Sequence, residues 1–409
     1  MPKDIYYISN GKMFRLRGGK PEELQSGMLE SYVRRVTDSA QRSEWKKSGS
    51  GAMFTGIFEG GSDAASKVSA IRSAVCCLGI DAGHLIYSLM IDGTAGIYRK
   101  YSSTDMNEGI ELSSGNDVYR DFDIRNGKMV FSSAFAGVSH IGVRKMGGSG
   151  ADREIFTAGY SWDSSPVWSA VDADQIYFCS AGLEEDSSEE KPETALSYQQ
   201  IIRMMMKSAQ AREMGPSAVC LLDIGERTLN EVLADPKYDF LHPQSTPDGA
   251  LWYVRRPYGP QDGKKAGGCL MDILLFPVRI IKAIAGFFNV FSVKYSGDTL
   301  YRPGDAKTKS QSQMMIDGNM IDAEAALKEN RSHGDENPGI IPRSWELHRR
   351  LPDGKDELIR RGVLAYRVRE DGTVAVSNGS ALLLLTPDEK SGKYKETKLD
   401  DTAKITFIL

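Results

Sequence analysis

Short strand–turn–strand units recur along the whole chain, and this repeat constrains the fold more than any other feature. Each turn carries an Asn-Gly or Asp-Gly pair between two apolar runs, which predicts a β-hairpin because such turns require positive φ. The hairpins predict a chain of short antiparallel strands. The turn pairs are Asn10-Gly11, Asp92-Gly93, Asn126-Gly127, Asp248-Gly249 and Asp371-Gly372.

The spacing of these units matches the length of a propeller blade. Tyr87, Phe131 and Phe178 occupy corresponding strands of successive units, so the repeat is roughly 45 residues long, as in a four-stranded blade. The sequence therefore predicts an all-β protein, a β-propeller of about seven four-stranded blades, with six as the alternative. The unit from Tyr32 to Ile71 is the least regular, so the predicted number of blades is uncertain by one.

The two ends of the chain complement each other. Residues Lys404–Leu409 read as a single strand, whereas the first apolar runs form a hairpin that lacks an inner strand. We expect the C-terminal strand to complete this first blade, because closing the ring removes open sheet edges. Residues 1–409 then form one propeller domain with helical insertions.

One unit carries a family resemblance. Ser165-Pro166-Val167-Trp168-Ser169, followed by Gln175-Ile176-Tyr177-Phe178, resembles the repeat of the TolB-like, WD-repeat-like propellers. Asp248–Tyr253 is similar to the turn and second strand of that repeat, and Arg153–Thr157 to its outer strand. The turn at Ala170–Asp174 departs from the usual Pro-Asp-Gly-Lys. The resemblance implies propeller architecture and, on its own, specifies no function.

Composition excludes several classes of protein. The net charge of −4 over 409 residues lacks the basic excess of a nucleic-acid binder. Five cysteines without a Cys-x-x-Cys spacing indicate free thiols in a reducing compartment.

The N-terminus, Met1–Tyr7, lacks the apolar core of a secretory signal, so we expect a cytoplasmic protein. Five histidines without a His-x-x-x-His spacing predict no metal site, and no cofactor is expected.

Catalytic motifs give no assignment, so the sequence leans against an enzyme. Gly159–Asp163 resembles a nucleophile elbow, but it lacks the second glycine and lies between strands instead of before a helix.

The alternative is an enzyme, a hydrolase or lyase, that acts on a small molecule in the propeller channel. Its first candidates are acidic residues near predicted inner strands, although turn and strand-end roles also account for them. They are Asp81, Asp121, Asp123 and Asp172.

Two insertions interrupt the repeat. The first, residues 184–215, combines the acidic loop Glu184–Glu190 with a predicted helix over Leu196–Met214. The second, residues 257–345, contains an apolar amphipathic helix at 270–293 and a polar loop with a short helix over Asp322–Glu329. First-turn acids explain Asp322 and Glu324 without a metal.

The predicted helix at 270–293 has three interpretations. Arg279 and Lys282 lie in its middle, where a charge costs about 2.5–3.5 kcal/mol, which disfavours a membrane span. A second interpretation is a helix that covers the side of the propeller. The third, an interfacial helix on a membrane or in a partner's groove, is favoured by a wide apolar face rich in phenylalanine. Pro277 kinks or divides the helix.

The sequence therefore predicts a non-enzymatic scaffold that binds a protein partner or an anionic membrane surface through the helix at 270–293. Self-association through the same helix is a further alternative. Peripheral binding at the inner membrane face follows from basic flanks at Arg255, Arg256, Lys264, Lys265 and Lys294. An enzyme would instead show carboxylates, His or Arg converging at the channel. The predicted contact residues are Leu274, Phe276, Arg279, Ile280, Lys282, Ile284, Phe287, Phe288 and Phe291.

Overall fold

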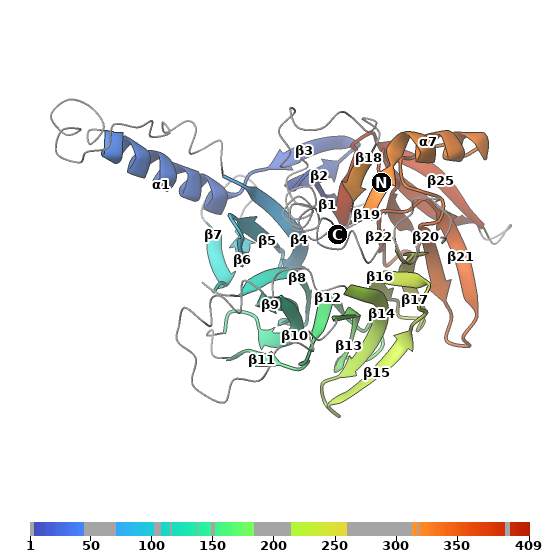
Figure 1. Cartoon of the computed structure of the whole chain (residues 1–409), viewed down its shortest axis with the longest axis horizontal. Coiled ribbons are helices and arrows are strands. Elements are labelled where there is room, and N and C mark those ends of the chain that lie inside the picture. The colour runs from blue at the N-terminus through green and yellow to red at the C-terminus, as the bar shows by residue number, and fades with distance from the viewer. Residues whose placement is uncertain are drawn as a thin grey trace, which may run out of the picture.

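The strands pair into four-stranded antiparallel blades arranged as a ring (Figure 1). The computed structural model describes residues 4–44, 71–101, 108–114, 117–135, 137–148, 152–183, 214–259, 313–316, 319–388 and 393–409. These ranges contain six such blades, numbered 1 to 6, with two more strands in a separate hairpin. The propeller class is therefore confirmed, and the blades within the described ranges number six, which is the alternative count.

The strands of each blade follow one another from the ring axis outwards. Blade 1 contains β26 (Ile405–Ile408), β1 (Ile5–Ser9), β2 (Lys12–Arg17) and β3 (Lys20–Leu24). Blade 2 contains β4 (Ser73–Asp81), β5 (His84–Ile91), β6 (Thr94–Lys100) and β7 (Glu108–Leu112). Blade 3 contains β8 (Val118–Arg125), β9 (Lys128–Phe135), β10 (Val138–Lys145) and β11 (Glu154–Ile155).

The remaining blades have the same order. Blade 4 contains β12 (Ser161–Trp168), β13 (Gln175–Leu183), β14 (Met214–Asp223) and β15 (Thr228–Leu233). Blade 5 contains β16 (Tyr238–Ser245), β17 (Leu251–Pro257), β20 (Glu346–Arg350) and β21 (Asp356–Arg361). Blade 6 contains β22 (Ala365–Val368), β23 (Val374–Ser377), β24 (Leu382–Asp388) and β25 (Lys393–Asp400). Outside the blades lie α1 (Gly27–Glu44), the hairpin β18 (Gln313–Ile316) with β19 (Asn319–Asp322), and α7 (Ala323–Ser332).

The ring closes through the C-terminal strand, as expected. In β26, Ile408 pairs with Tyr7 and Phe407 with Ile8, both in β1. The innermost strands β26, β4, β8, β12, β16 and β22 contact one another in a closed cycle. The N-terminal and C-terminal ends of the chain therefore share one blade, and the sheet edges of the inner strands are covered.

Local turn chemistry accounts for the hairpins. Asn10 and Gly11 have φ of 48° and 71°, and Asn126 and Gly127 have 51° and 69°. These are the two successive positive φ values that a tight hairpin turn requires.

The short helix predicted at Asp322 is also present, because the Asp322 side chain caps α7 by accepting a hydrogen bond from Ala325 N at 3.0 Å.

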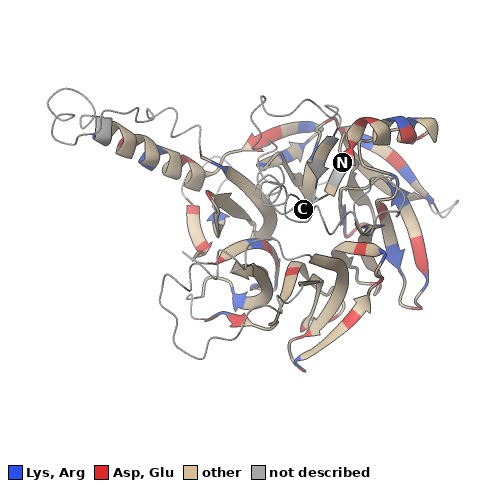
Figure 2. Cartoon of the chain, in the orientation of Figure 1, with Lys and Arg blue, Asp and Glu red and all other residues tan. Residues whose placement is uncertain are grey.

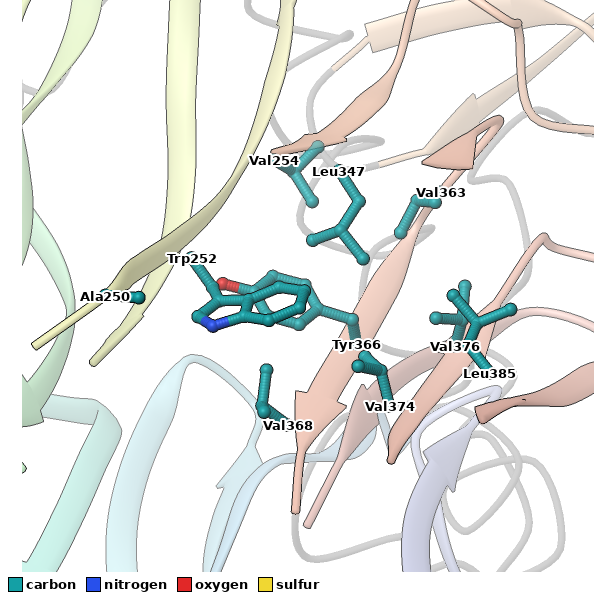
Figure 3. Close-up of a cluster of buried hydrophobic side chains, with 10 residues drawn as sticks. All are labelled: Ala250, Trp252, Val254, Leu347, Val363, Tyr366, Val368, Val374, Val376 and Leu385. Atoms are coloured by element: carbon teal, nitrogen blue, oxygen red, sulfur yellow. The ribbon is translucent and has the colours of Figure 1, made fainter. Parts of the chain in front are cut away.

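The core lies between neighbouring blades. Figure 3 shows the cluster between blades 5 and 6, where Trp252 and Leu347 on blade 5 face Tyr366 and Val376 on blade 6. Strand side chains alternate between the two faces of a blade, so each blade contributes apolar residues to both of its neighbours. This packing holds the inner strands at the ring axis.

Helix α1 corrects the expectation of an irregular blade from Tyr32 to Ile71. It projects from the ring in Figure 1, and the strands of blade 2 begin only at Ser73. The Ser26 hydroxyl caps its N-terminus by accepting from Leu29 N at 3.1 Å. The Glu108 carboxylate accepts from Met28 N at 3.0 Å, which fixes the helix to blade 2.

Several predicted elements lie outside the described residues. They are the acidic loop Glu184–Glu190, the helix from Leu196 up to residue 213, and the whole of the predicted helix at 270–293. Met214, expected as the last residue of the first of these helices, is instead the first residue of β14.

Candidate functional site

Polar side chains converge on the ring axis at irregularities in the inner strands. The register shifts by one residue between Tyr119 and Phe122 in β8, and similar bulges occur in β12 and β16. A bulge bends its strand and redirects a side chain, and bulges are frequent beside functional sites. The bulged residues include Asp121, Ser165 and His242.

Two of these residues have an uncommon backbone conformation. Ser165 and His242 have φ of 50° and 53°, a left-handed region that residues other than glycine rarely adopt. Pro166 and Pro243 follow them, and proline, which has no N–H to donate, fits a bulge better than a regular ladder position. The Ser-Pro and His-Pro pairs thus produce the same local geometry in blades 4 and 5.

Hydrogen bonds link the bulged residues across blades 3 to 6. The Ser165 hydroxyl lies 3.5 Å from His242 Nδ1. Ser165 N donates to Asp121 Oδ2 at 3.2 Å, and the Tyr366 hydroxyl donates to the His242 carbonyl oxygen at 2.6 Å. Residues from four consecutive blades therefore hold this arrangement.

A second carboxylate, Asp123, lies on the same inner strand. Trp168 N donates to its Oδ2 at 2.9 Å. Burial raises the pKa of Asp123 above its ordinary value, while the positive charge of Arg367 opposes this effect. Arg367 lies on β22 of blade 6, opposite blade 3 in the ring, so its charge reaches Asp123 across the axis.

The Arg367 guanidinium makes no hydrogen bond or ion pair within the described part of the chain, although its residue is half-buried. Gln244 on β16 joins blade 5 to the next residue of β22: it donates to Val368 O at 2.8 Å and accepts from Val368 N at 2.9 Å.

The structure brings together two of the four suspected carboxylates. Asp121 and Asp123 lie at the axis, whereas Asp81 pairs with Arg99 at 2.7 Å on blade 2. Asp172 is exposed in the turn after β12, where it accepts from Asp174 N at 2.9 Å. Asp81 and Asp172 thus have the turn and strand-end roles that sequence reasoning gave as the other interpretation.

Sequence reasoning missed His242 and Arg367. The signal for His242 was available, because His242-Pro243 repeats Ser165-Pro166 one blade later, at a similar distance before the next strand. Arg367 had no local signal, since its position depends on the packing of blade 6 against the rest of the ring.

The predicted contact residues between Leu274 and Phe291 lie outside the described residues. Two of the basic residues that flank them are described, and both belong to the fold. Arg255 pairs with Glu346 at 2.6 Å, and Arg256 pairs with Asp239 at 3.0 Å. The expectation that these two cations face an anionic leaflet is therefore wrong.

The chain leaves and re-enters the described blades at adjacent places. The Tyr258 hydroxyl, just before residues 260–312, donates to the carbonyl oxygen of Met214, just after residues 184–213, at 2.6 Å. The two insertions predicted from the sequence thus join the ring side by side on blades 4 and 5.

Metal ligands and membrane-spanning helices are both absent from the described ranges. There, no group of three or more His, Cys, Asp or Glu side chains is arranged to hold a metal ion. No helix in those ranges has the length and apolar character needed to cross a membrane.

Strand pairing defines the class of this protein as a β-propeller. Neither a protein-family model nor a curated protein matches the sequence. TolB from Acinetobacter baumannii is similar in structure, with a TM-score of 0.45 and 9% identity over 99% of this chain, which spans 65% of the TolB chain.

Other solved propellers show comparable similarity. A nidogen/laminin complex gives a TM-score of 0.44 and 7% identity, with 99% of this chain and 97% of that chain covered. A puromycin hydrolase gives 0.41 and 9%, with coverage of 96% and 44%. Such likeness does not identify a function, which depends on this chain's own residues.

Proposed function

We propose that this protein is a non-enzymatic propeller scaffold that contacts an anionic membrane surface through segment 270–293, with a protein partner as the alternative occupant. The proposal includes a cytoplasmic location with peripheral binding at the inner membrane face. It rests on one observation about blade 5, the blade into which the segment is inserted.

Blade 5 is complete without the insertion. Strands β17 and β20 pair directly, from Leu251 with Arg350 to Arg255 with Glu346, although the long insertion separates them in sequence. The ladder therefore needs no strand from residues 260–312. An apolar segment that a blade does not need for its own hydrogen bonds is available to cover another surface.

The composition of the segment favours lipid. Phe276, Phe287, Phe288 and Phe291 supply rings suited to the acyl boundary, and Arg279 and Lys282 supply cations for the headgroups. The insertion of residues 184–213 joins the ring beside it and begins with a run of acidic residues. This acidic run would limit the approach of a strongly anionic bilayer, so binding should depend on the aromatic residues more than on the cations.

Vesicle co-sedimentation of the full chain tests the proposal. We expect binding to phosphatidylcholine vesicles that contain phosphatidylserine, and loss of binding in a Phe287→Glu/Phe288→Glu double variant whose thermal melt is unchanged. Neutralising Arg279 and Lys282 should weaken binding less, by about 1 kcal/mol each.

Phe135→Glu is the matched control, because Phe135 is an exposed phenylalanine on blade 3 with 41% of its surface accessible. This control should bind vesicles like the unmodified protein. Unfolding of the double variant would place the segment in the core and contradict the proposal. Binding to a protein in place of vesicles would support the alternative occupant.

An enzyme that acts at the ring axis is the second candidate, and it is favoured by polar residues on the inner strands β8, β16 and β22, namely Asp121, His242 and Arg367. A His242→Asn variant separates the two candidates. A scaffold that works through segment 270–293 keeps its vesicle binding in this variant, whereas an axial enzyme loses its reaction.

A further inference from the structure

The long insertions leave the ring at one edge. Neighbouring strands of a blade are antiparallel, so the end of the second strand and the end of the fourth strand lie at the same edge of the ring. The insertions of residues 184–213 and 260–312 follow the second strands β13 and β17, and α1 follows the fourth strand β3. We call this edge the insertion edge. The turns that follow the inner strands, such as the turn after β12, lie at the opposite edge.

Four apolar residues form a continuous row along the insertion edge of blades 4 and 5. Leu183 N donates to Tyr160 O at 3.0 Å, and Leu183 pairs with Met214 between β13 and β14. The Tyr258 hydroxyl donates to Met214 O at 2.6 Å and extends the row to blade 5. We call these four residues the apolar row.

The apolar row is accessible. Tyr160, Met214 and Tyr258 expose 51%, 45% and 43% of their surface, and Leu183 is half-buried. A single exposed apolar residue is ordinary on a protein surface, but several that adjoin one another mark a surface that binds another molecule.

The position of the row indicates what that molecule is. Tyr258 lies just before residues 260–312, so the row is at the root of the insertion that carries segment 270–293. A segment bound to a bilayer keeps its root near the lipid, and a second contact in the same molecule then forms at a high effective concentration. The two tyrosines combine an apolar ring with a polar hydroxyl, which suits the headgroup region of a membrane.

We propose that the apolar row is a second membrane contact, which enters the headgroup region of the bilayer when segment 270–293 binds. The inference rests on the proposed function, because a row of four residues is too small to hold the protein at a bilayer without the segment. It orients the ring, with the insertion edge of blades 4 and 5 toward the lipid and the opposite edge toward the solution. Phe135, on blade 3, lies outside this contact.

Vesicle co-sedimentation of the full chain with phosphatidylcholine vesicles that contain phosphatidylserine tests the inference. The row variant is Tyr160→Glu/Met214→Glu. It keeps both hydrogen bonds of the row, because Tyr160 and Met214 accept them through their carbonyl oxygens. Two anionic side chains in place of apolar ones should weaken vesicle binding by at least roughly fivefold and leave the thermal melt unchanged.

The matched control is Ile80→Glu/Val171→Glu. It adds the same charge at the opposite edge, where Ile80 and Val171 expose 47% and 65% of their surface. This control should bind vesicles like the unmodified protein. Tyr160→Trp is the conservative variant and should bind at least as tightly as the unmodified protein, because tryptophan is favoured at the membrane interface.

Failure of the row and failure of the proposed function give different results. An unmodified protein that does not bind vesicles contradicts both. Vesicle binding by the unmodified protein, with equal affinity in the row variant and the opposite-edge control, overturns the inference about the row and leaves the role of segment 270–293 intact. A lower melting temperature of the row variant would mean that this chain's own residues cover the row, which also overturns the inference.

Discussion

At the residue scale, buried charge is used in two different ways. Lys100 and Glu108 form an ion pair at 3.1 Å, with side chains only 2% and 0% exposed. The Lys100 ammonium also donates to Gln25 O at 2.9 Å, and Glu108 accepts from the Tyr87 hydroxyl. These contacts satisfy both charges and hold the start of α1, whereas the half-buried Arg367 acts on the carboxylate of Asp123 without a hydrogen bond to it.

This difference predicts how Lys100 responds to substitution. Lys100→Met leaves Glu108 as a buried carboxylate without its cation, and removal of one partner from such a pair costs about 3–5 kcal/mol. Urea denaturation measures the loss. Lys12→Met removes a surface partner of Glu23 and should change the free energy of unfolding by under about 1 kcal/mol. Equal effects of the two substitutions would contradict the distinction.

His348 on blade 5 predicts a pH dependence of stability. Burial lowers the pKa of His348 below its ordinary value of 6.5, and the bond to Glu346 opposes part of this effect. As the pH falls below 6.5, the unfolded chain therefore takes up the proton before the folded protein does. The free energy of unfolding should decrease as the pH falls through this range.

Urea midpoints measured as a function of pH test this prediction. The decrease just below pH 6.5 should be smaller in a His348→Gln variant than in the unmodified protein. His333→Gln, which changes an exposed histidine at the end of α7, should keep the original slope. An unchanged slope in His348→Gln would mean that His348 does not titrate differently in the two states.

Serine reactivity is a further property of single residues. Ser161 lies at the start of β12 and pairs with Gly182, and no helix follows it. Ser165 lies 3.5 Å from His242 Nδ1, and the Asp121 carboxylate accepts from the Ser165 backbone N–H. We expect a fluorophosphonate probe to label neither serine, and mass-spectrometric detection of an adduct on either would show a serine hydrolase.

At the element scale, elements specified by neighbouring residues were predictable from the sequence. Asn10-Gly11 and Asn126-Gly127 determine their hairpins locally, and Asp322 caps α7 from the adjacent residue. Helix α1 was missed although Ser26 is a capping residue, because the segment carries no strong apolar run. Its position depends on Glu108, which is distant in sequence.

The C-terminal strand is the element whose loss should have the largest effect. Ile405 and Ile408 of β26 are buried in the core shared by blades 1 and 6. Deletion of residues 404–409 removes the inner strand of blade 1 and reopens the ring, so we expect loss of the cooperative melt. Ile408→Ala is the milder test and should cost about 2–5 kcal/mol. Val171→Ala, at a position 65% exposed, should cost under about 0.5 kcal/mol.

At the scale of the whole molecule, the sequence revealed the architecture better than the site. The repeat predicts a propeller because each blade has its own turns and alternation. The charge of Arg367 acts on Asp123 only because the ring places blades 3 and 6 opposite each other, and no local sequence pattern reports this arrangement. The blade number was similarly uncertain, because α1 occupies residues that a regular repeat would use for strands.

Charges of both signs lie on the outer strands of the blades. Figure 2 shows Lys and Arg interspersed with Asp and Glu over these strands. Mixed charge of this kind gives only a weak long-range attraction to anionic lipid. Membrane binding should for this reason depend on the apolar insertion in blade 5 instead of on the charges of the ring.

The ring and the insertion in blade 5 should be separable. β17 and β20 pair directly, and the described contacts of blade 5 do not require residues 260–312. We predict that replacing these residues with a short glycine-serine linker leaves a folded propeller, because a flexible loop adds only a slowly growing entropy cost.

Circular dichroism and a thermal melt measure the fold of this shortened protein, and vesicle co-sedimentation measures its function. The expected result is a cooperative melt within a few degrees of the full chain, with binding to phosphatidylserine vesicles lost. A shortened chain that aggregates or melts without cooperativity would show instead that the insertion covers the propeller itself, and the scaffold proposal would then fail.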